Sequence, residues 1–367
     1  MAKRIDRLFF WFIIGFSIFG FLIFLSASLG LLNRDGARFN VVALKQFILL
    51  SIGLGLFLIV GRLNYRSWQK MALIIGLASL LLTCLVFIPN LGFEAGGAKR
   101  WIALGGLTVQ PAEFMKLGFI FCFAAWLGEP SNKKHLSTAG LWTFLILLSL
   151  TALPLVLQPD IDTLFIIFSA GLAMFLVSEA RWSHIGLIIV LVAIAASLIA
   201  WQKPYIVERI KTYLDPTRDP LSASWQVNQS LIAIGSGGTS GRGFGQSLQK
   251  FHYLPEPIGD SIFAVAAEEF GFIGGILIIV SFVIFALLGL KVSIRAPTNF
   301  GRLLCVGIVI MITTGAFINI ASMLGLIPLT GTPLLFISHG GTALLVAFIG
   351  SGVILSVARS TVKHYPS

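Results

Sequence analysis

The chain has 367 residues, of which 57% are hydrophobic and only 11% are charged. Soluble domains carry about 25% charged residues, so this composition excludes a mainly soluble protein and predicts an all-α polytopic membrane protein. The net charge of +11 fits basic residues that flank membrane spans and meet anionic headgroups, so we expect membrane lipid, and no nucleic acid, as a partner.

Ten apolar runs approach the roughly 20 residues that a helix needs to cross a bilayer. They lie at about 8–30, 43–61, 71–89, 112–128, 138–157, 161–178, 184–202, 261–290, 302–326 and 338–358. The first run is longer than the apolar core of a signal peptide, so no cleavage is expected. Cys84, Cys122 and Cys305 fall inside these runs and are interpreted as buried apolar side chains. We interpret residues 1–367 as a single integral membrane domain.

Basic residues are distributed unevenly between the two ends of these runs. Ten spans put both termini on one side, and short cytoplasmic loops are enriched in Lys and Arg. The end that carries the termini has 14 basic residues, against six near the short loops at the other end. The sequence therefore predicts cytoplasmic termini and one large extracytoplasmic loop, at about 203–260, between the seventh and eighth helices.

This long loop has the composition of an ordered segment. Apolar residues recur at helical spacing over 206–214, which predicts an amphipathic segment on the membrane surface, and turns are expected over 214–220. A glycine-rich segment, SLIAIGSGGTSGRGFGQS, follows. It does not match a nucleotide phosphate loop, because Phe244 stands where the lysine is required. We therefore expect a close-packed or hinged loop and no nucleotide.

A first polar cluster opens the fourth run. Glu113 and Lys116 stand three residues apart, the spacing at which side chains on one helix face meet. A salt bridge at a helix start is the simpler interpretation. However, the apolar sequence GFIFCFAAWLG follows Lys116 closely, so its ammonium lies just inside the membrane boundary and needs a cavity or a partner. Asp160 and Asp162, in QPDIDT, add carboxylates at the same level.

A second polar cluster precedes the eighth run, in KFHYLPEPIGDSIFAVAAEEFGFIGG. Asp260 stands immediately before the run, and Glu268 and Glu269 lie about two turns inside it. A charge at the mouth of a membrane helix is costly, which makes Asp260 a candidate functional residue. The alternative, that Asp260 only caps the next helix, is left open.

Five motifs carry a family resemblance: GAKRWIALGGLTVQPAEFMKL, QPDIDT, QSLIAIGSGGTSGRGFGQS, YLPEPIGDSIFAVAAEE and LLFISHGGTALL, in this order. Over about residues 90–358 the chain resembles the SEDS family (shape, elongation, division and sporulation). LTVQPAEFMKL and QKFHYLPEP resemble its division branch, FtsW, more than its elongation branch, RodA. The resemblance implies a bacterial cytoplasmic-membrane enzyme that polymerises peptidoglycan glycan strands from lipid II outside the membrane. It also implies a class B penicillin-binding transpeptidase and other divisome proteins as partners.

By motif match, the essential acid of the family falls on Asp260 and its important membrane-boundary residues fall on Arg100, Glu113 and Lys116. We expect these four to converge on one outward-opening site. Asp260 would act as general base on the acceptor 4-hydroxyl, and Arg100 and Lys116 would bind the departing diphosphate. Asp160 and Glu268 complete the expected substrate-binding set, Glu268 being a carboxylate that would raise the pKa of Asp260. A divalent cation, Mg²⁺ or Mn²⁺, would suit the outer carboxylates, but no metal ligands are assigned.

The chain departs from the family pattern at two places. Ile258 and Gly259 precede Asp260 where the family usually has His-Thr, and Asp162 stands where it usually has glycine. These differences concern the positioning around Asp260 and not the acid itself. Two other functions stay open: a lipid flippase or transporter, which should show internal repeats, and a non-catalytic scaffold for a transpeptidase.

Overall fold

The computed structural model describes residues 2–32, 36–89, 91–95, 98–104, 107–129, 136–178, 181–215 and 223–364. Each of the ten apolar runs contains a helix. These helices are α1 (Ala2–Ser28), α2 (Gly36–Val60), α3 (Tyr65–Cys84), α4 (Pro111–Leu127), α5 (Leu136–Leu157), α6 (Ile161–Val177), α7 (Trp182–Gln202), α11 (Ile262–Ile294), α12 (Asn299–Met323) and α13 (Gly341–His364). The polytopic helical membrane fold is therefore confirmed.

Eight of these helices are long and apolar enough to cross a bilayer by length and composition. The other two, α4 and α6, have 17 residues each. Because α4 carries Glu113 and Lys116 in its first two turns, its apolar part is shorter than its full length. The number of ten spans therefore stays a prediction, which depends on whether these two short helices also cross the bilayer.

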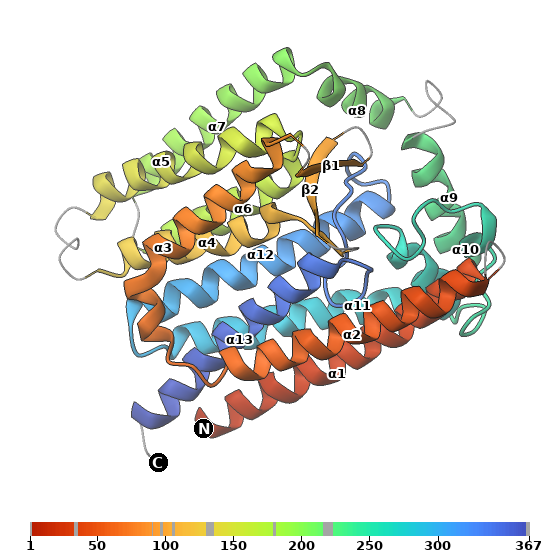
Figure 1. Ribbon diagram of the computed structural model, residues 1–367, viewed down its shortest axis with the longest axis horizontal. Helices are drawn as coiled ribbons and strands as arrows, with labels where there is room; N and C mark the ends of the chain where they lie inside the picture. Colours follow the sequence, from red (N-terminus) through yellow and green to blue (C-terminus); the bar gives the residue numbers. More distant parts are fainter. Residues whose placement is uncertain are drawn as a thin grey trace.

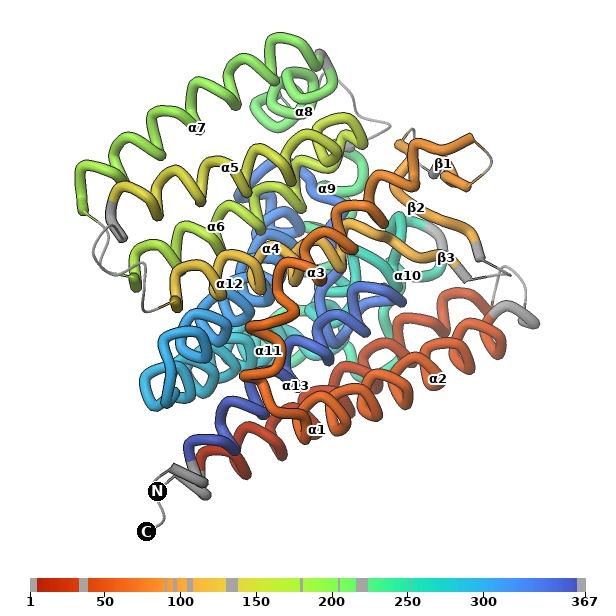
Figure 2. The backbone as a smooth tube through the Cα atoms, turned by 60° about the vertical axis from the view of Figure 1, so that its left-hand side comes forward, coloured from red at the N-terminus to blue at the C-terminus, as the bar shows by residue number. Residues whose placement is uncertain are grey.

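The helices lie roughly side by side, with both termini at one end of the molecule (Figure 1). From one edge to the other the order runs from α7 through α5 to the pair α1 and α2, with α4, α12 and α13 in between (Figure 2). Most residues in the most apolar stretches of α12 and α13 are buried inside the protein, 78% and 83%, against 11% in α7. The core is therefore built around α12 and α13, while α7 presents most of its surface to lipid.

The end opposite the termini carries most of the irregular structure (Figure 1). The predicted amphipathic segment is the helix α8 (Pro204–Leu214), and α9 (Ala223–Ser236) and α10 (Gln249–His252) follow it. The turns expected after residue 215 lie outside the described residues. A small antiparallel sheet, which the all-α prediction did not include, consists of β1 (Gly92–Ala95), β2 (Ala98–Leu104) and β3 (Leu107–Val109), in the order β1-β2-β3.

The helix α11 is broken at Gly271, whose φ and ψ are 67° and −163°. The glycine-rich loop fills the break with its backbone. The amides of Phe272 and Ile273 donate to the carbonyls of Gly238 and Thr239 (2.8 and 3.2 Å). On the other side of the break, the carbonyl of Glu268 accepts from the backbone amide of Arg242 (3.0 Å) and that of Glu269 from the next amide along the loop (2.9 Å).

Glycine is required where this loop approaches α11. A Cβ added at residue 237 would lie 2.1 Å from the carbonyl oxygen of Ala267, and one at Gly241 would lie 2.1 Å from that of Glu269. The expectation of a close-packed loop is therefore confirmed.

Candidate functional site

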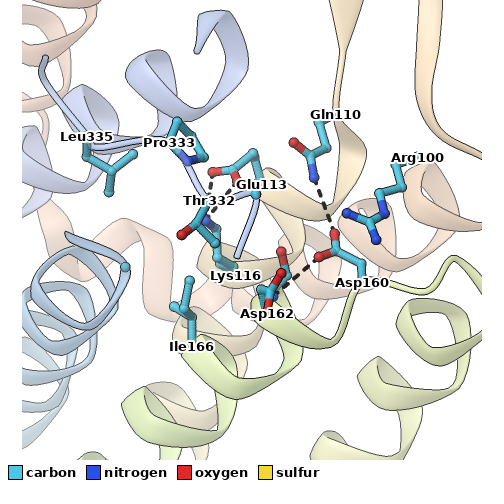
Figure 3. A pocket seen from close by; sticks show the side chains of 13 residues that line it. Arg100, Gln110, Glu113, Lys116, Asp160, Asp162, Ile166, Thr332, Pro333 and Leu335 are labelled. Carbon is cyan, nitrogen blue, oxygen red and sulfur yellow. Dashed lines mark hydrogen bonds and ion pairs between the residues drawn. The ribbon is translucent and has the colours of Figure 1, made fainter. Parts of the chain in front are cut away.

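A polar pocket opens among β2, α4, α6, α12 and the connection between α12 and α13 (Figure 3). The strand β2 lies at the end of the molecule opposite the termini (Figure 1). The pocket encloses about 440 Å³ of empty space, including its mouth. Its lining residues are Arg100, Gln110, Glu113, Lys116, Asp160, Asp162, Thr163, Ile166, Gly315, Gly331, Thr332, Pro333 and Leu335. Four of the six site residues expected from sequence meet here: Arg100, Glu113, Lys116 and Asp160.

Glu113 and Lys116 form a buried ion pair on the first turns of α4. The ammonium of Lys116 lies 2.8 Å from each carboxylate oxygen of Glu113, and the side chains of Glu113 and Lys116 are only 5% and 6% exposed. Pro111 begins the helix, so this pair projects from its entrance. The salt bridge expected from the spacing is therefore present. A buried pair of this kind contributes little net stability, since both charges lose water, and it serves better as a device for holding charge in a fixed place.

Arg100 and Asp160 belong to a second group of contacts in the pocket. The guanidinium of Arg100 donates to the main-chain carbonyls of Gln158 (3.1 Å) and Pro159. Asp160 caps α6 by accepting from the amide of Thr163 (3.3 Å), and its other oxygen accepts from the side chain of Gln110 (3.2 Å). Arg100 thus holds the corner between α5 and α6 from the sheet, and its charge faces the Asp160 side of the pocket (Figure 3).

The acidic residues of the pocket are largely committed to protein partners. Asp162 lies 3.7 Å from the guanidinium of Arg209 on α8, while Asp160 and Glu113 have the partners given above. Within the described ranges, no group of three or more His, Cys, Asp or Glu side chains is arranged to hold a metal ion. The donors do not fit a resident divalent cation, and we derive no step through one.

Asp260 lies outside the lining of this pocket, in the turn that leads into α11. It is half-buried, and one carboxylate oxygen accepts a hydrogen bond from the side chain of Gln226 on α9 (3.0 Å). Burial raises the pKa of Asp260 from 3.8 to about 6, the Gln226 hydrogen bond opposes this rise, and the Glu256 carboxylate adds to it. Glu256, and not Glu268, is therefore the carboxylate that influences Asp260.

Asp260 is not the N-cap of α11. The N-cap is Ser261, whose side chain makes no capping hydrogen bond within the described residues. The carboxylate of Asp260 nevertheless accepts hydrogen bonds from backbone amides at this helix start, its own and that of Ser261, so the cap interpretation stays an alternative that the activity of Asp260→Asn decides.

The turn before Asp260 is fixed through three consecutive main-chain carbonyls. That of Ile258 accepts from the amide of His339 (2.7 Å), and that of Gly259 from the hydroxyl of Ser338 (2.7 Å). The carbonyl of Asp260 accepts from the side chain of Asn319 (2.7 Å). Because the acceptors are backbone atoms, the turn is held without the usual His-Thr side chains at its first two positions.

Asn319 also connects this turn to the pocket. Its amide group, fully buried on α12, donates to the carbonyl of Thr332 as well (2.8 Å), and Thr332 lines the pocket. The segment from Thr332 to His339 thus contributes to the pocket at one end and holds the Asp260 turn at the other. The expected convergence is present for the pocket residues, while Asp260 is joined to them through this segment.

Glu268 and Glu269 lie in a separate buried network behind the break in α11. The carboxylate of Glu268 accepts hydrogen bonds from the hydroxyl of Ser247 (2.6 Å) and from the backbone amides of Leu248 and Gln249. The guanidinium of Arg242 lies 3.5 Å from the same carboxylate. Glu269 pairs with the buried ammonium of Lys250 (2.6 Å) and accepts from Ser26 on α1. Both glutamates are at most 1% exposed. These contacts fix the loop against α11, so we do not retain Glu268 among the proposed substrate-binding residues.

Sequence reasoning missed the residues that position Asp260. Gln226, Asn319, Ser338 and His339 were not singled out as site residues. Asn319 had a usable signal, because it is an amide side chain in the middle of an apolar run. Ser338 and His339 lie in the LLFISHGGTALL motif, which indicated a family and not a role. Burial and the charge of Lys45 lower the pKa of His339, so its ring, which contacts Gln46 (3.1 Å), favours the neutral form.

Comparisons with known proteins agree along nearly the whole chain. The model of the cell cycle protein family matches residues 6–363. Stage V sporulation protein E of Bacillus subtilis is 37% identical over 320 residues, covering 86% of this chain and 87% of that relative. A probable peptidoglycan glycosyltransferase FtsW of Trichlorobacter lovleyi is 32% identical over 357 residues, covering 94% and 91%.

Among solved structures, one chain from a peptidoglycan synthase complex that coordinates polymerization and crosslinking has a TM-score of 0.76 and 27% identity. The match covers 95% of this chain and 97% of that one. The range matched by the family model, residues 6–363, contains both the pocket residues and the Asp260 turn.

Proposed function

The chain belongs to the cell cycle protein family, which is the SEDS family, and is a peptidoglycan glycosyltransferase; we propose that Asp260 is its general base. The observation that carries the residue assignment is a carboxylate at the mouth of α11 whose pKa is raised to about 6. A base is most effective when its pKa lies close to the working pH, and an exposed Asp near pKa 4 is a weak base at neutral pH.

In the proposed reaction, lipid II is the donor and the 4-hydroxyl of a second saccharide is the acceptor. The acceptor oxygen forms a bond to the donor anomeric carbon as the bond from that carbon to the diphosphate breaks. The acceptor proton passes to Asp260, and the electron pair leaves with the lipid diphosphate. A single displacement of this kind inverts the anomeric centre and needs no covalent intermediate.

We propose the polar pocket as the place where the diphosphate is held. Arg100 and Lys116 would supply positive charge there, and Glu113 and Asp160 would keep these cations oriented. The lining combines two cations with three carboxylates, so the diphosphate would compete with Glu113 for the ammonium of Lys116. We retain a divalent cation, Mg²⁺ or Mn²⁺, in the proposal only as a counter-ion that enters the site together with the substrate.

The protein is a multi-pass membrane protein, and we propose the bacterial inner membrane with both termini cytoplasmic. A class B penicillin-binding transpeptidase is the proposed partner, because the similar chain of known structure comes from a peptidoglycan synthase complex. The relatives described above include a sporulation protein and an FtsW. We propose a role in division, because LTVQPAEFMKL and QKFHYLPEP resemble the division branch of the family.

The test is the purified protein with fluorescent lipid II, with and without a class B transpeptidase and with and without a chelator, resolved for glycan chain length. Wild type should form polymer, and Asp260→Asn should lose about 10²- to 10⁴-fold in rate, as removal of a general base does. Equal rates for the two proteins would reject Asp260 as the base. Movement of lipid II across vesicles without polymer would favour a flippase, and no activity with intact partner binding would favour a scaffold.

Asp260→Asn also has a stability control. Because the pKa of Asp260 is higher in the folded state than its ordinary value of 3.8, its contribution to stability is present below pH 4 and is lost as the pH rises through about 6. At pH 7 the ionised carboxylate is therefore unfavourable for folding. The asparagine variant should unfold at the same temperature as wild type or higher, so that lost activity cannot be attributed to misfolding.

A further inference from the structure

A basic cavity lies where the end of α2, the start of α3 and the last turns of α13 meet. These helix ends lie at the end of the molecule that carries both termini (Figure 1). The cavity encloses about 870 Å³ of empty space including its mouth. Its lining residues are Gly61, Arg62, Leu63, Asn64, Arg66, Ser356, Arg359 and Ser360. The proposed glycosyl transfer uses none of these residues.

Three arginines in this cavity keep their charge available. Within the described part of the chain, none of Arg62, Arg66 and Arg359 forms an ion pair with a carboxylate. Arg62 and Arg66 are exposed, and Arg359 donates one hydrogen bond to the carbonyl of Gly61 (3.1 Å). Clustered, unneutralised guanidinium groups repel one another, and they match the bidentate geometry of a phosphate oxyanion.

The start of α3 adds to this preference for an anion. Asn64 caps α3, and both Asn64 and Arg66 line the cavity, so the positive end of a 20-residue helix lies at its wall. The carbonyls that follow α2 would repel an anion, but both already accept hydrogen bonds. That of Gly61 accepts from Arg359, and that of Leu63 from the buried hydroxyl of Ser356 (2.5 Å).

An apolar groove continues directly from the basic cavity. It encloses about 1,090 Å³ of empty space including its open side, among α2, α3, α4 and α13. Leu63 lines both spaces. Val60 of the groove precedes Gly61 of the cavity on α2, and Val353 of the groove lies one turn before Ser356 on α13. Apart from Ser79, the groove is lined by apolar side chains, including Trp68, Ile75 and Phe121.

We propose that the cavity and the groove together form a binding site for an anionic phospholipid. The three arginines hold the phosphodiester headgroup, and one acyl chain lies in the groove. A soluble phosphate would satisfy the cavity and leave the groove without a role, whereas an amphiphile with a charged head and an apolar tail accounts for both. Basic pockets between membrane helices are known to bind anionic headgroups. The site is separate from the catalytic pocket and goes beyond the proposed function.

The test is native mass spectrometry of the purified full chain in detergent, titrated with dioleoyl phosphatidylglycerol or dioleoyl phosphatidylcholine. Phosphatidylglycerol should bind at least tenfold more tightly, because only its headgroup has a net negative charge. Arg62→Gln/Arg66→Gln should weaken phosphatidylglycerol binding roughly thirtyfold, since two cations near the headgroup are removed. Arg302→Gln is the matched control: it removes an exposed arginine at the start of α12, outside the cavity, and should leave binding unchanged.

A second variant tests the groove independently of the charges. Ala78 is exposed and lines the groove, so Ala78→Phe should fill part of it and weaken lipid binding while the arginines stay intact. Equal binding of the two lipids by wild type would overturn the proposal. Full competition by glycerol phosphate at the concentration of the lipid would reduce the site to a phosphate site and would also overturn it. If the arginine variant aggregates, the wild-type headgroup comparison and Ala78→Phe decide the question.

Discussion

At the scale of single residues, the environment of Asp260, the proposed general base, would set the pH range of the reaction. The carboxyl must be ionised to accept a proton, and its pKa of about 6 is raised by burial and further by Glu256. Activity should therefore fall as the pH is lowered through about 6. Three backbone carbonyls anchor the turn. The carboxyl of Asp260 is therefore held in this environment although Ile258 and Gly259 stand in place of the usual His-Thr.

Glu256→Gln tests this account without touching the carboxyl itself. Loss of a neighbouring negative charge favours ionisation, so the pKa of Asp260 should fall and the acid limb of the pH–rate profile should move to lower pH. The measurement is the polymerisation rate between pH 4.5 and 8 at saturating lipid II. Ser240→Ala, on an exposed part of the glycine-rich loop, is the control. An acid limb that stays in place, or moves to higher pH, would contradict the assignment.

Variants of the Glu113–Lys116 pair can distinguish a structural role of Lys116 from a role in substrate binding. Lys116→Ala leaves the buried Glu113 carboxylate unpaired and should lower stability by about 3–5 kcal/mol. The double variant Glu113→Gln/Lys116→Met removes both charges and should recover most of that loss. If Lys116 holds the diphosphate, the double variant should still show a raised KM for lipid II, partly rescued by excess substrate. A double variant with the wild-type KM would make the pair purely structural.

At the scale of elements, the break in α11 is the feature on which the Asp260 segment depends. The short half of α11 begins beside Asp260 and ends at Gly271, where the glycine-rich loop supplies the missing hydrogen-bond partners. Behind it, the buried pair of Lys250 and Glu269 ties the loop to α11 (2.6 Å). We infer that the loop determines where this half-helix, and hence the Asp260 turn, sits relative to the rest of the bundle.

Two glycines in the loop provide a matched test. Gly238 and Gly241 both have positive φ, +56° and +81°, so alanine at either position costs about 1–2 kcal/mol in backbone energy. Only Gly241→Ala adds a contact, 2.1 Å from the carbonyl of Glu269, while nothing lies within 4 Å of the added Cβ at Gly238. Gly241→Ala should destabilise by about 4 kcal/mol or more and reduce polymerisation. Unfolding in detergent–SDS mixtures measures the difference, and equal effects would show that the loop is loosely packed.

At the scale of the whole molecule, the two ends of the helix bundle differ, because the termini lie at one end and the loop helices at the other. The termini lie at one end, while the sheet, α8 and α9 lie at the other (Figure 1). The basic cavity is lined by residues of the first end, and the polar pocket by residues next to the sheet. This arrangement agrees with the uneven distribution of basic residues, because the end with the termini is the one predicted to be cytoplasmic. It also separates the proposed phospholipid site from the proposed reaction by the length of the bundle.

Cysteine accessibility in intact cells checks this sidedness. In a background with the three native cysteines replaced by serine, Ser240→Cys should react with a membrane-impermeant maleimide without lysis. Lys70→Cys, exposed at the opposite end, should react only after lysis. The reverse pattern would place the polar pocket on the cytoplasmic side and would remove the basis for polymerisation outside the membrane.

The membrane segments could be predicted from the sequence because the length of an apolar run is a local property. The same holds for the amphipathic helix α8 and for the ion pair of Glu113 and Lys116, whose partners stand within one turn of each other. Asp260, the candidate acid at the mouth of α11, could also be identified from the sequence, because a carboxylate beside a long apolar run is unusual in itself. Each of these features depends on residues that are neighbours in the chain.

Only the tertiary structure decided which distant groups meet. Ser26 contacts Glu269 across 243 positions, and Asn319 reaches the carbonyl of Asp260 across 59. The acceptors in the Asp260 turn are main-chain oxygens, which every residue possesses, so no side-chain pattern reveals them. The division of the acids into a pocket group with Glu113 and Asp160 and a structural group with Glu268 likewise follows from helix packing. Burial and pairing are set by contacts between elements, and these exist only once the chain has folded.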